Sequence, residues 1–106
     1  MLRRLPAVHD PEKRLSDLGV KLIYPAAPPA NYVKAVRVGN ILYLAGHLPQ
    51  KEDGSLIKGK LGKDLSVEQG RIAAELAAIN LLSTLKKEVG DLKKVVKIIK
   101  VLGMVN

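Results

Sequence analysis

The pattern of apolar and polar positions predicts two neighbouring β-strands in the first half of the chain. The runs 33–38 and 41–45 are mostly apolar and are separated by Gly39 and Asn40, two residues that tolerate the positive φ angles of a tight hairpin turn. Apolar and charged residues alternate in the first run, whereas the second run is apolar at almost every position. We therefore expect a hairpin whose second strand is covered on both faces of a sheet.

The longest periodic segment predicts a helix over residues 67–89. Ser66 and Gln69 match the capping-box pattern at its start, and Gly90 can end it. Between positions 72 and 82 only two residues are polar, so this helix is apolar nearly all round. We expect it to need a second partner besides a sheet, either another helix or another subunit.

Two further segments precede the predicted hairpin. A short helix is expected from about 11 to 18, because Asp10 can cap it, Pro11 suits its first position and Gly19 can end it. The proline-rich stretch 24–30 predicts an extended, polyproline-like strap rather than a flexible linker.

The last segment, 92–105, is ambiguous by its period. Lys93, Lys97 and Lys100 would share one face of a helix, but the many β-branched residues of the segment favour a strand, which we predict. The order of elements is then helix, strand, strand, long helix and strand, which indicates an α+β fold. With 106 residues the chain forms one domain, with an N-terminal helical extension at about 10–19.

Composition excludes several kinds of chemistry. There is no cysteine, and with only His9 and His47 a histidine-rich metal site is not expected either, so we expect no metal and no cofactor. The net charge of +8 favours acidic partners such as nucleic acid, but only three tyrosines and no other aromatic residues are available to stack on bases. The simpler interpretation is a basic protein of the lysine-rich, cysteine-free kind common in heat-adapted organisms. No membrane span or signal peptide is evident, so a cytoplasmic protein is expected.

Candidate chemistry is confined to a few positions around the predicted hairpin. His47 could act as a general base or ligand, but a histidine between a strand end and a proline is more often a hydrogen-bonded corner. Gly46 would let a ligand approach the backbone closely and could donate its N–H, although a bulge or bend is the better explanation for a lone glycine. Tyr32 could cover a pocket with its ring and offer its hydroxyl, but a tyrosine in such a place is more often a half-buried boundary residue.

Two long stretches resemble a known family. "GVKLIYPAAPPANYVKAVRVGNILYLAGHLP" and "GKLGKDLSVEQGRIAAELAAINLLSTLKKEVGDLKKVVKIIKVLGMVN" are similar, in the order of their motifs, to the RidA/YjgF family. The resemblance covers nearly the whole chain from about Pro11. It implies a chorismate-mutase-like α+β fold, with a mixed sheet and helices on one face, assembled as a homotrimer with clefts between the subunits.

The resemblance also implies a choice of functions. Family members of the best-known branch hydrolyse reactive enamines and imines derived from amino acids, releasing ammonia and a keto acid. Others are labelled endoribonucleases or translation inhibitors, and many have no known activity. Three hypotheses follow: hydrolysis of a C=N bond, RNA cleavage or RNA binding, and non-catalytic binding of a small metabolite or a partner protein in the intersubunit cleft.

Some positions of the family's cleft can be carried over to this chain. By resemblance, Tyr32 falls at the cleft tyrosine, and Ala45 and Gly46 match a Ser-Gly pair at the end of the second strand. The serine hydroxyl is therefore absent here, while the backbone donors remain. His47 stands where the pattern usually has glutamine. These four residues are the candidate substrate-binding set, and no residue is assigned as catalytic.

The family pattern continues beyond the point where this chain stops. By resemblance, a further helix and two strands would follow Asn106, bearing an arginine that grips the substrate carboxylate and a glutamate that positions water. We therefore expect a C-terminally shortened member of the family, either a truncated reading frame or a relict stabilised by subunit contacts or strand exchange, with at most a partial deaminase cleft.

Overall fold

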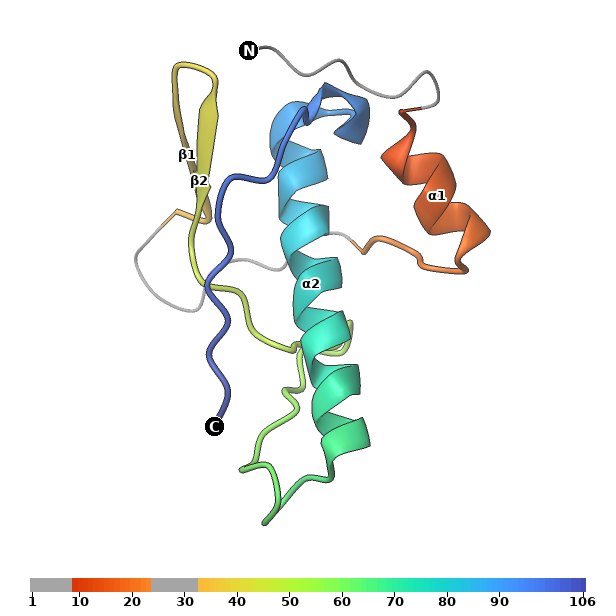
Figure 1. Ribbon diagram of the computed structural model, residues 1–106, viewed down its shortest axis with the longest axis vertical. Helices are drawn as coiled ribbons and strands as arrows, with labels where there is room; N and C mark the ends of the chain where they lie inside the picture. The colour runs from red at the N-terminus through yellow and green to blue at the C-terminus, as the bar shows by residue number, and fades with distance from the viewer. Residues whose placement is uncertain (1–8, 24–32) are drawn as a thin grey trace.

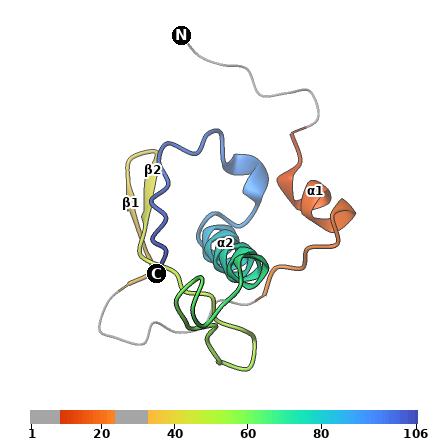
Figure 2. The ribbon, with the colours of Figure 1, turned by 60° about the horizontal axis from the view of Figure 1, so that its bottom comes forward.

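A computed structural model describes residues 9–23 and 33–106. Its elements, in chain order, are α1 (Pro11–Asp17), β1 (Ala35–Val38), β2 (Ile41–Leu44), α2 (Val67–Val89) and the 3-10 helix η1 (Leu92–Lys94). The long helix α2 stands in the middle, with the hairpin on one side and α1 on the other (Figures 1 and 2). The predicted strap 24–30 lies outside the described residues.

The predicted hairpin is confirmed. β1 and β2 pair antiparallel, from Ala35 opposite Leu44 to Val38 opposite Ile41. Gly39 has the positive φ angle, 59°, that the tight turn requires. The expectation that β2 is covered on both faces is wrong for this chain: Leu42 and Leu44 are half-buried, but the other face is open and Tyr43, which lies on it, is 60 % exposed. Of the described helices, α2 packs against the hairpin, through β1, and the face that carries Tyr43 has no comparable neighbour among the described residues.

The boundaries of α2 also agree with the sequence prediction. The Ser66 hydroxyl accepts the Gln69 N–H and the Gln69 side chain accepts the Ser66 N–H, which completes the capping box. Gly90 ends the helix with a φ of 84°. The two fully buried residues of α2 are polar, Ser83 and Thr84, whereas its leucines are only half-buried. The predicted need for a second partner therefore stays open.

The short helix α1 begins and ends as predicted. The Asp10 carboxylate accepts the N–H of Lys13 at its start. Glu12 then joins α1 to the far end of α2, since its carboxylate pairs with Lys86 and accepts the Leu92 N–H at 3.1 Å. α1 is thus held against the junction of α2 and η1.

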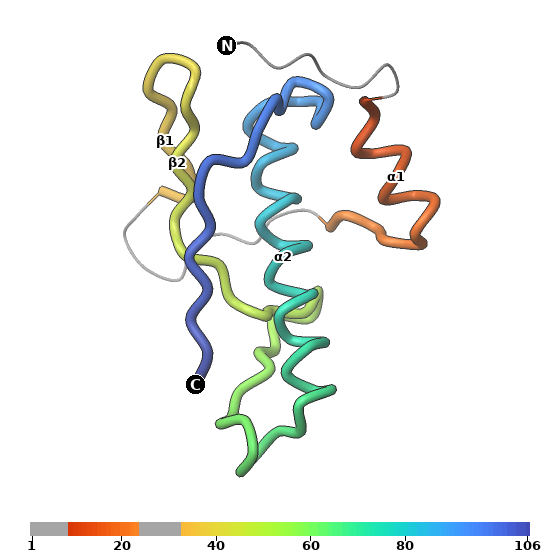
Figure 3. The backbone as a smooth tube through the Cα atoms, viewed as in Figure 1, coloured from red at the N-terminus to blue at the C-terminus, as the bar shows by residue number. Residues whose placement is uncertain are grey.

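The prediction of a strand over 92–105 is wrong. The Asp91 carboxylate accepts the Lys93 N–H and so caps the 3-10 helix η1, whose first residue, Leu92, is buried. From Val95 to Asn106 the chain forms no helix or strand. The tail passes on the β2 side of α2 (Figures 2 and 3). Beyond Val95 it makes one backbone hydrogen bond with the described residues, in which the Leu61 N–H donates to the Asn106 carbonyl. A β-prone segment without a paired neighbour cannot complete a ladder, so the observed sheet has two antiparallel strands and is not mixed.

The chain as a whole is an α+β fold with a thin core. Among the described residues, Leu92 is the only fully buried apolar one, at 1 % exposure. By contrast, Tyr43 on the hairpin is 60 % exposed, and Ile99 and Leu102 on the tail are 71 % and 76 % exposed. Much apolar surface on the hairpin and the tail therefore faces outward.

None of the helices in the described part of the chain has an apolar stretch long enough to cross a membrane.

Candidate functional site

The candidate site lies where β2 ends. The Ala45 N–H donates to the Lys34 carbonyl at 2.8 Å, which extends the hairpin ladder by one step beyond the strand. Ala45 and His47 are half-buried and Gly46 is exposed. Tyr32, the remaining member of the candidate set, lies outside the described residues. The structure thus brings Ala45, Gly46 and His47 into one short segment that leaves the sheet and approaches α2.

His47 is held at both ring nitrogens. Its Nδ1 lies 2.8 Å from the Ala45 carbonyl oxygen and its Nε2 lies 2.7 Å from the Thr84 hydroxyl. A carbonyl oxygen can only accept, so Nδ1 carries the proton, and in the neutral ring Nε2 accepts the hydroxyl proton of Thr84. In this arrangement neither nitrogen is available to a substrate, so the ring serves as a corner that joins the strand end to the helix.

A second contact from the same face of α2 fixes the segment that follows. The Asn80 side-chain amide donates to the carbonyls of both Leu48 and Gln50, each at 2.9 Å. Asn80 and Thr84 are four residues apart and therefore share one side of the helix. Together they anchor the chain from the strand end to residue 50.

Gly46 is the most accessible backbone of this segment. A Cβ atom built on it would meet nothing within 4 Å, and its φ angle is not in the left-handed region. Within residues 9–23 and 33–106 its N–H has no hydrogen-bond partner. The strand end therefore presents a donor in open space, which a ligand oxygen can approach closely.

Among the described residues, no carboxylate with a shifted pKa lies in the strand-end segment. The carboxylates with shifted pKa values lie elsewhere and owe the shifts to local contacts: hydrogen bonds from Ser55 lower the pKa of Asp53, and the Lys93 N–H lowers that of Asp91. In the part of the chain that the structure describes, no three metal-ligating side chains come together. The chemistry offered at the strand end is hydrogen bonding by backbone and amide groups.

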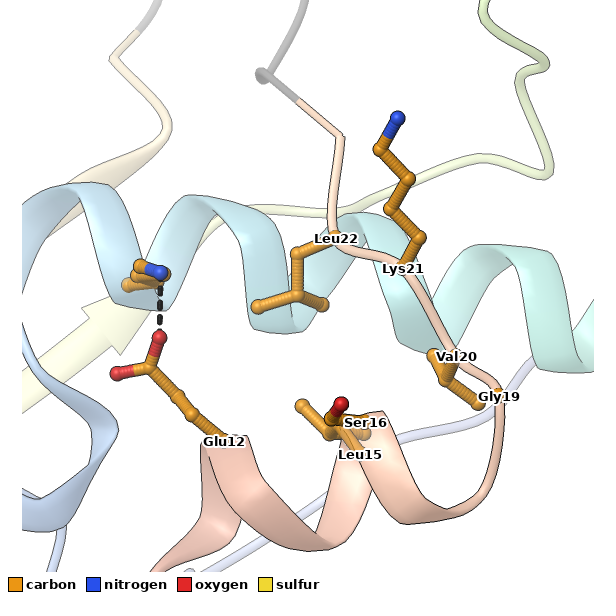
Figure 4. Close-up of a pocket in the computed structure, with 8 residues that line it drawn as sticks. Glu12, Leu15, Ser16, Gly19, Val20, Lys21 and Leu22 are labelled. Atoms are coloured by element: carbon orange, nitrogen blue, oxygen red, sulfur yellow. Dashed lines mark ion pairs between the residues drawn. The ribbon is translucent and has the colours of Figure 1, made fainter.

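A shallow pocket of about 380 Å³ lies on the opposite side of α2, between that helix and α1 (Figure 4). Leu15, Val20 and Leu22 supply apolar walls, and the ion pair of Glu12 with Lys86 closes one end. Positions 84 and 86 of a helix are about 200° apart around its axis, so this pocket is separate from the strand-end segment.

Sequence reasoning identified the segment but missed the residues that hold it. Thr84 gave no signal, because a threonine in a long helix is ordinary. Asn80 could have been found, since it is one of two polar residues in the apolar stretch 72–82. A polar residue in such a stretch is expected to meet a hydrogen-bond partner when its helix packs.

Comparison with known proteins agrees with this architecture. A family model described as "YjgF/chorismate_mutase-like, putative endoribonuclease" matches residues 12–106. Protein TCP17 of Trypanosoma cruzi is 38 % identical over 92 residues, which are 87 % of this chain and 58 % of that protein.

Two solved structures are also similar. A putative endoribonuclease from Shewanella oneidensis MR-1 has a TM-score of 0.73 and 37 % identity, covering 78 % of this chain and 55 % of that one. The protein Atu1372 of Agrobacterium tumefaciens, described as being of unknown function, has a TM-score of 0.64 and 40 % identity, covering 77 % and 50 %. The chain therefore spans between 50 % and 58 % of the length of these relatives. Because the family model matches most of its residues, the chain belongs to the YjgF/chorismate-mutase-like family.

Proposed function

We propose that this protein promotes the hydrolysis of a C=N bond in small imines and enamines derived from amino acids. The observation that carries the proposal is that the Gly46 N–H, at the open end of β2, has no hydrogen-bond partner among the described residues, in a chain of this family. In the reaction, water adds to the imine carbon, the resulting amino alcohol loses ammonia, and a 2-keto acid remains. The substrate thus gains one water and releases one ammonia.

The chemistry is compatible with a site that offers no nucleophile. Imines react with water unaided, so a protein gains rate mainly by orienting the substrate and by stabilising negative charge. The Gly46 N–H can donate to a carboxylate oxygen of the substrate. The proposal assigns Tyr32, Ala45 and His47 to the walls around that donor, with His47 placed there through its hydrogen bonds to Ala45 and Thr84.

The test generates 2-aminoacrylate in the presence of the purified protein and follows pyruvate release. The expected result is release that is faster than in buffer and proportional to protein concentration. No acceleration over buffer refutes the proposal. Thermal stabilisation by pyruvate without turnover would instead support the third hypothesis, a module that binds metabolites without reaction.

Gly46→Ala is the matched variant for this assay. Its methyl group meets no described atom within 4 Å, so the variant is expected to fold as the parent does. The methyl would stand where a ligand approaches the N–H, and we expect a loss of about tenfold, which corresponds to about 1.4 kcal/mol. An unchanged rate would remove Gly46 from the site.

We further propose that the exposed apolar faces are covered by self-association as a homotrimer with clefts between subunits. The exposed apolar side chains of the tail, among them Ile99 and Leu102, support this, as does the outward-facing apolar side of β2. Sedimentation equilibrium should give three times the chain mass. Ile41→Asp on β2 should lower that mass, whereas Val67→Asp at the start of α2 should not; a monomeric parent protein rejects the proposal.

The second candidate function is RNA binding. It is favoured by the net charge of +8 and by three exposed lysines, Lys94, Lys97 and Lys100, that form no ion pair with any residue in the described ranges. Titration of a labelled RNA at several salt concentrations should show affinity that falls steeply with salt, and a flat response eliminates this function. Replacing Lys97 and Lys100 by alanine should reduce the slope, while replacing Lys13, which is paired with Asp17, serves as the control.

A further inference from the structure

We infer that Thr84 is a positioning residue of the strand-end site, acting through His47 on the direction of the Gly46 N–H. Thr84 lies on α2, 37 residues away in sequence from His47, and does not itself line the exposed segment. The inference deepens the proposed function and rests on it for its catalytic consequence. Its structural part stands on hydrogen bonds within the chain.

The first step is the anchor. Thr84 is 2 % exposed, and its hydroxyl faces the Nε2 atom of His47 at 2.7 Å. A buried hydroxyl that lost this partner would be left unsatisfied, so the hydrogen bond holds the imidazole ring in one orientation. The imidazole ring is rigid and is attached to the backbone through Cβ. Holding Nε2 at Thr84 therefore also determines where Nδ1 lies.

The second step passes from the ring to the backbone. With Nε2 held by Thr84, the Nδ1–H of His47 points to the Ala45 carbonyl oxygen at 2.8 Å. That carbonyl belongs to the same peptide unit as the Gly46 N–H. The unit is planar and trans, so its C=O and N–H point in opposite directions. Fixing the Ala45 carbonyl toward His47 therefore fixes the Gly46 N–H away from it, toward the open side of the strand end.

The third step concerns what else holds this peptide unit. The Ala45 N–H is bound to Lys34, which fixes the preceding peptide plane, and Asn80 holds the carbonyls of Leu48 and Gln50. None of these bonds engages the plane between Ala45 and Gly46. Its orientation therefore depends on His47 and Thr84, and the loss of that pair should free one peptide unit while the neighbouring segment stays in place.

Two pairs of variants separate positioning from simple folding. Thr84→Val keeps the shape of the side chain and removes the hydroxyl, whereas Thr84→Ser keeps the hydroxyl. In His47→Gln the amide can reach Thr84 but leaves no donor for the Ala45 carbonyl, whereas in His47→Asn the amide can donate to Ala45 but cannot reach Thr84, so each variant breaks one of the two bonds of the ring. Ser83→Ala is the control, since Ser83 is equally buried but binds the Ile23 N–H and the Ile79 carbonyl.

Two measurements are made on each variant. The first is amide hydrogen exchange at Gly46 and, for comparison, at Ala45, by NMR without ligand. The second is acceleration of pyruvate release from 2-aminoacrylate. Thr84→Val, His47→Gln and His47→Asn should shift the Gly46 amide resonance and its exchange rate and should lower the acceleration about tenfold through KM. Thr84→Ser, which keeps the hydroxyl, and Ser83→Ala should remain close to the parent protein in both.

The outcomes separate this inference from the proposed function. If the parent protein shows no acceleration, the function fails, and the Gly46 amide still decides the positioning role. If Thr84→Val leaves that amide unchanged, or if Ser83→Ala disturbs it as strongly, the inference is overturned. If Thr84→Val changes the Gly46 amide resonance and exchange rate but leaves pyruvate release unchanged, the inferred effect of Thr84 on catalysis is overturned.

Discussion

Leu92 should contribute more to the stability of the chain than any other apolar residue that the structure describes. It is 1 % exposed, at the junction of α1, α2 and η1, and Glu12 binds its N–H. Leu92→Ala removes three methylene-sized groups from this site, worth about 2.4 kcal/mol at about 0.8 kcal/mol each. Because the cavity left behind collapses only partly, the expected loss is about 3–4 kcal/mol. The unfolding midpoint should then fall by at least about 12 °C in a chain of this length.

The assay is thermal and urea unfolding followed by circular dichroism at 222 nm. Leu18→Ala is the matched control, because the same atoms are removed from a side chain that is 68 % exposed at the end of α1. It should change stability by less than about 0.5 kcal/mol. Equal losses in the two variants would refute the reasoning, since they would mean that the loss of stability does not follow burial.

Three further predictions concern local features. Ser66→Ala removes the side-chain acceptor at the start of α2 and should cost about 1 kcal/mol in urea unfolding. Gly59→Ala should cost more than Gly62→Ala in the same assay, because both glycines have positive φ angles but only at Gly59 would the new Cβ lie 2.8 Å from another side-chain carbon. The hydrogen bond from Arg71 lowers the pKa of Glu68 below its ordinary value of 4.5. The ionised Glu68 carboxylate therefore stabilises the fold above pH 4.5, and this stabilisation is lost as the pH falls through the lowered pKa. Glu68→Gln should therefore show a smaller drop in midpoint than the parent protein on going from about pH 5 to pH 3, and an equal or larger drop would contradict this.

The elements that sequence predicted correctly are those specified by neighbouring residues. The hairpin turn needs Gly39 to adopt a positive φ, and the start of α2 needs Ser66 and Gln69 three residues apart. Each of these requirements is met by residues that lie within a few positions of one another in the sequence. Local hydrogen bonds and backbone sterics decide them, so they can be predicted without knowing the rest of the molecule.

The elements that sequence predicted wrongly depend on partners far along the chain. The tail has strand-forming residues, but a strand exists only when another backbone pairs with it, and residues 95–106 have no such pairing in this structure. Likewise, β2 has an apolar sequence on both faces, and whether each face is covered depends on what packs there. β-propensity shows that a segment can form a strand, but contacts with the rest of the fold decide whether the strand forms and which of its faces are covered.

For the candidate site the division is the same. The sequence by itself determined that a glycine follows the second strand and that a histidine comes next, because both are read directly from positions 46 and 47. Only the tertiary structure decided what the histidine does, since its partner Thr84 is brought beside it by the packing of α2 against the strand end. The physical reason is that a buried hydroxyl needs a partner, and the fold determines which residue meets that need.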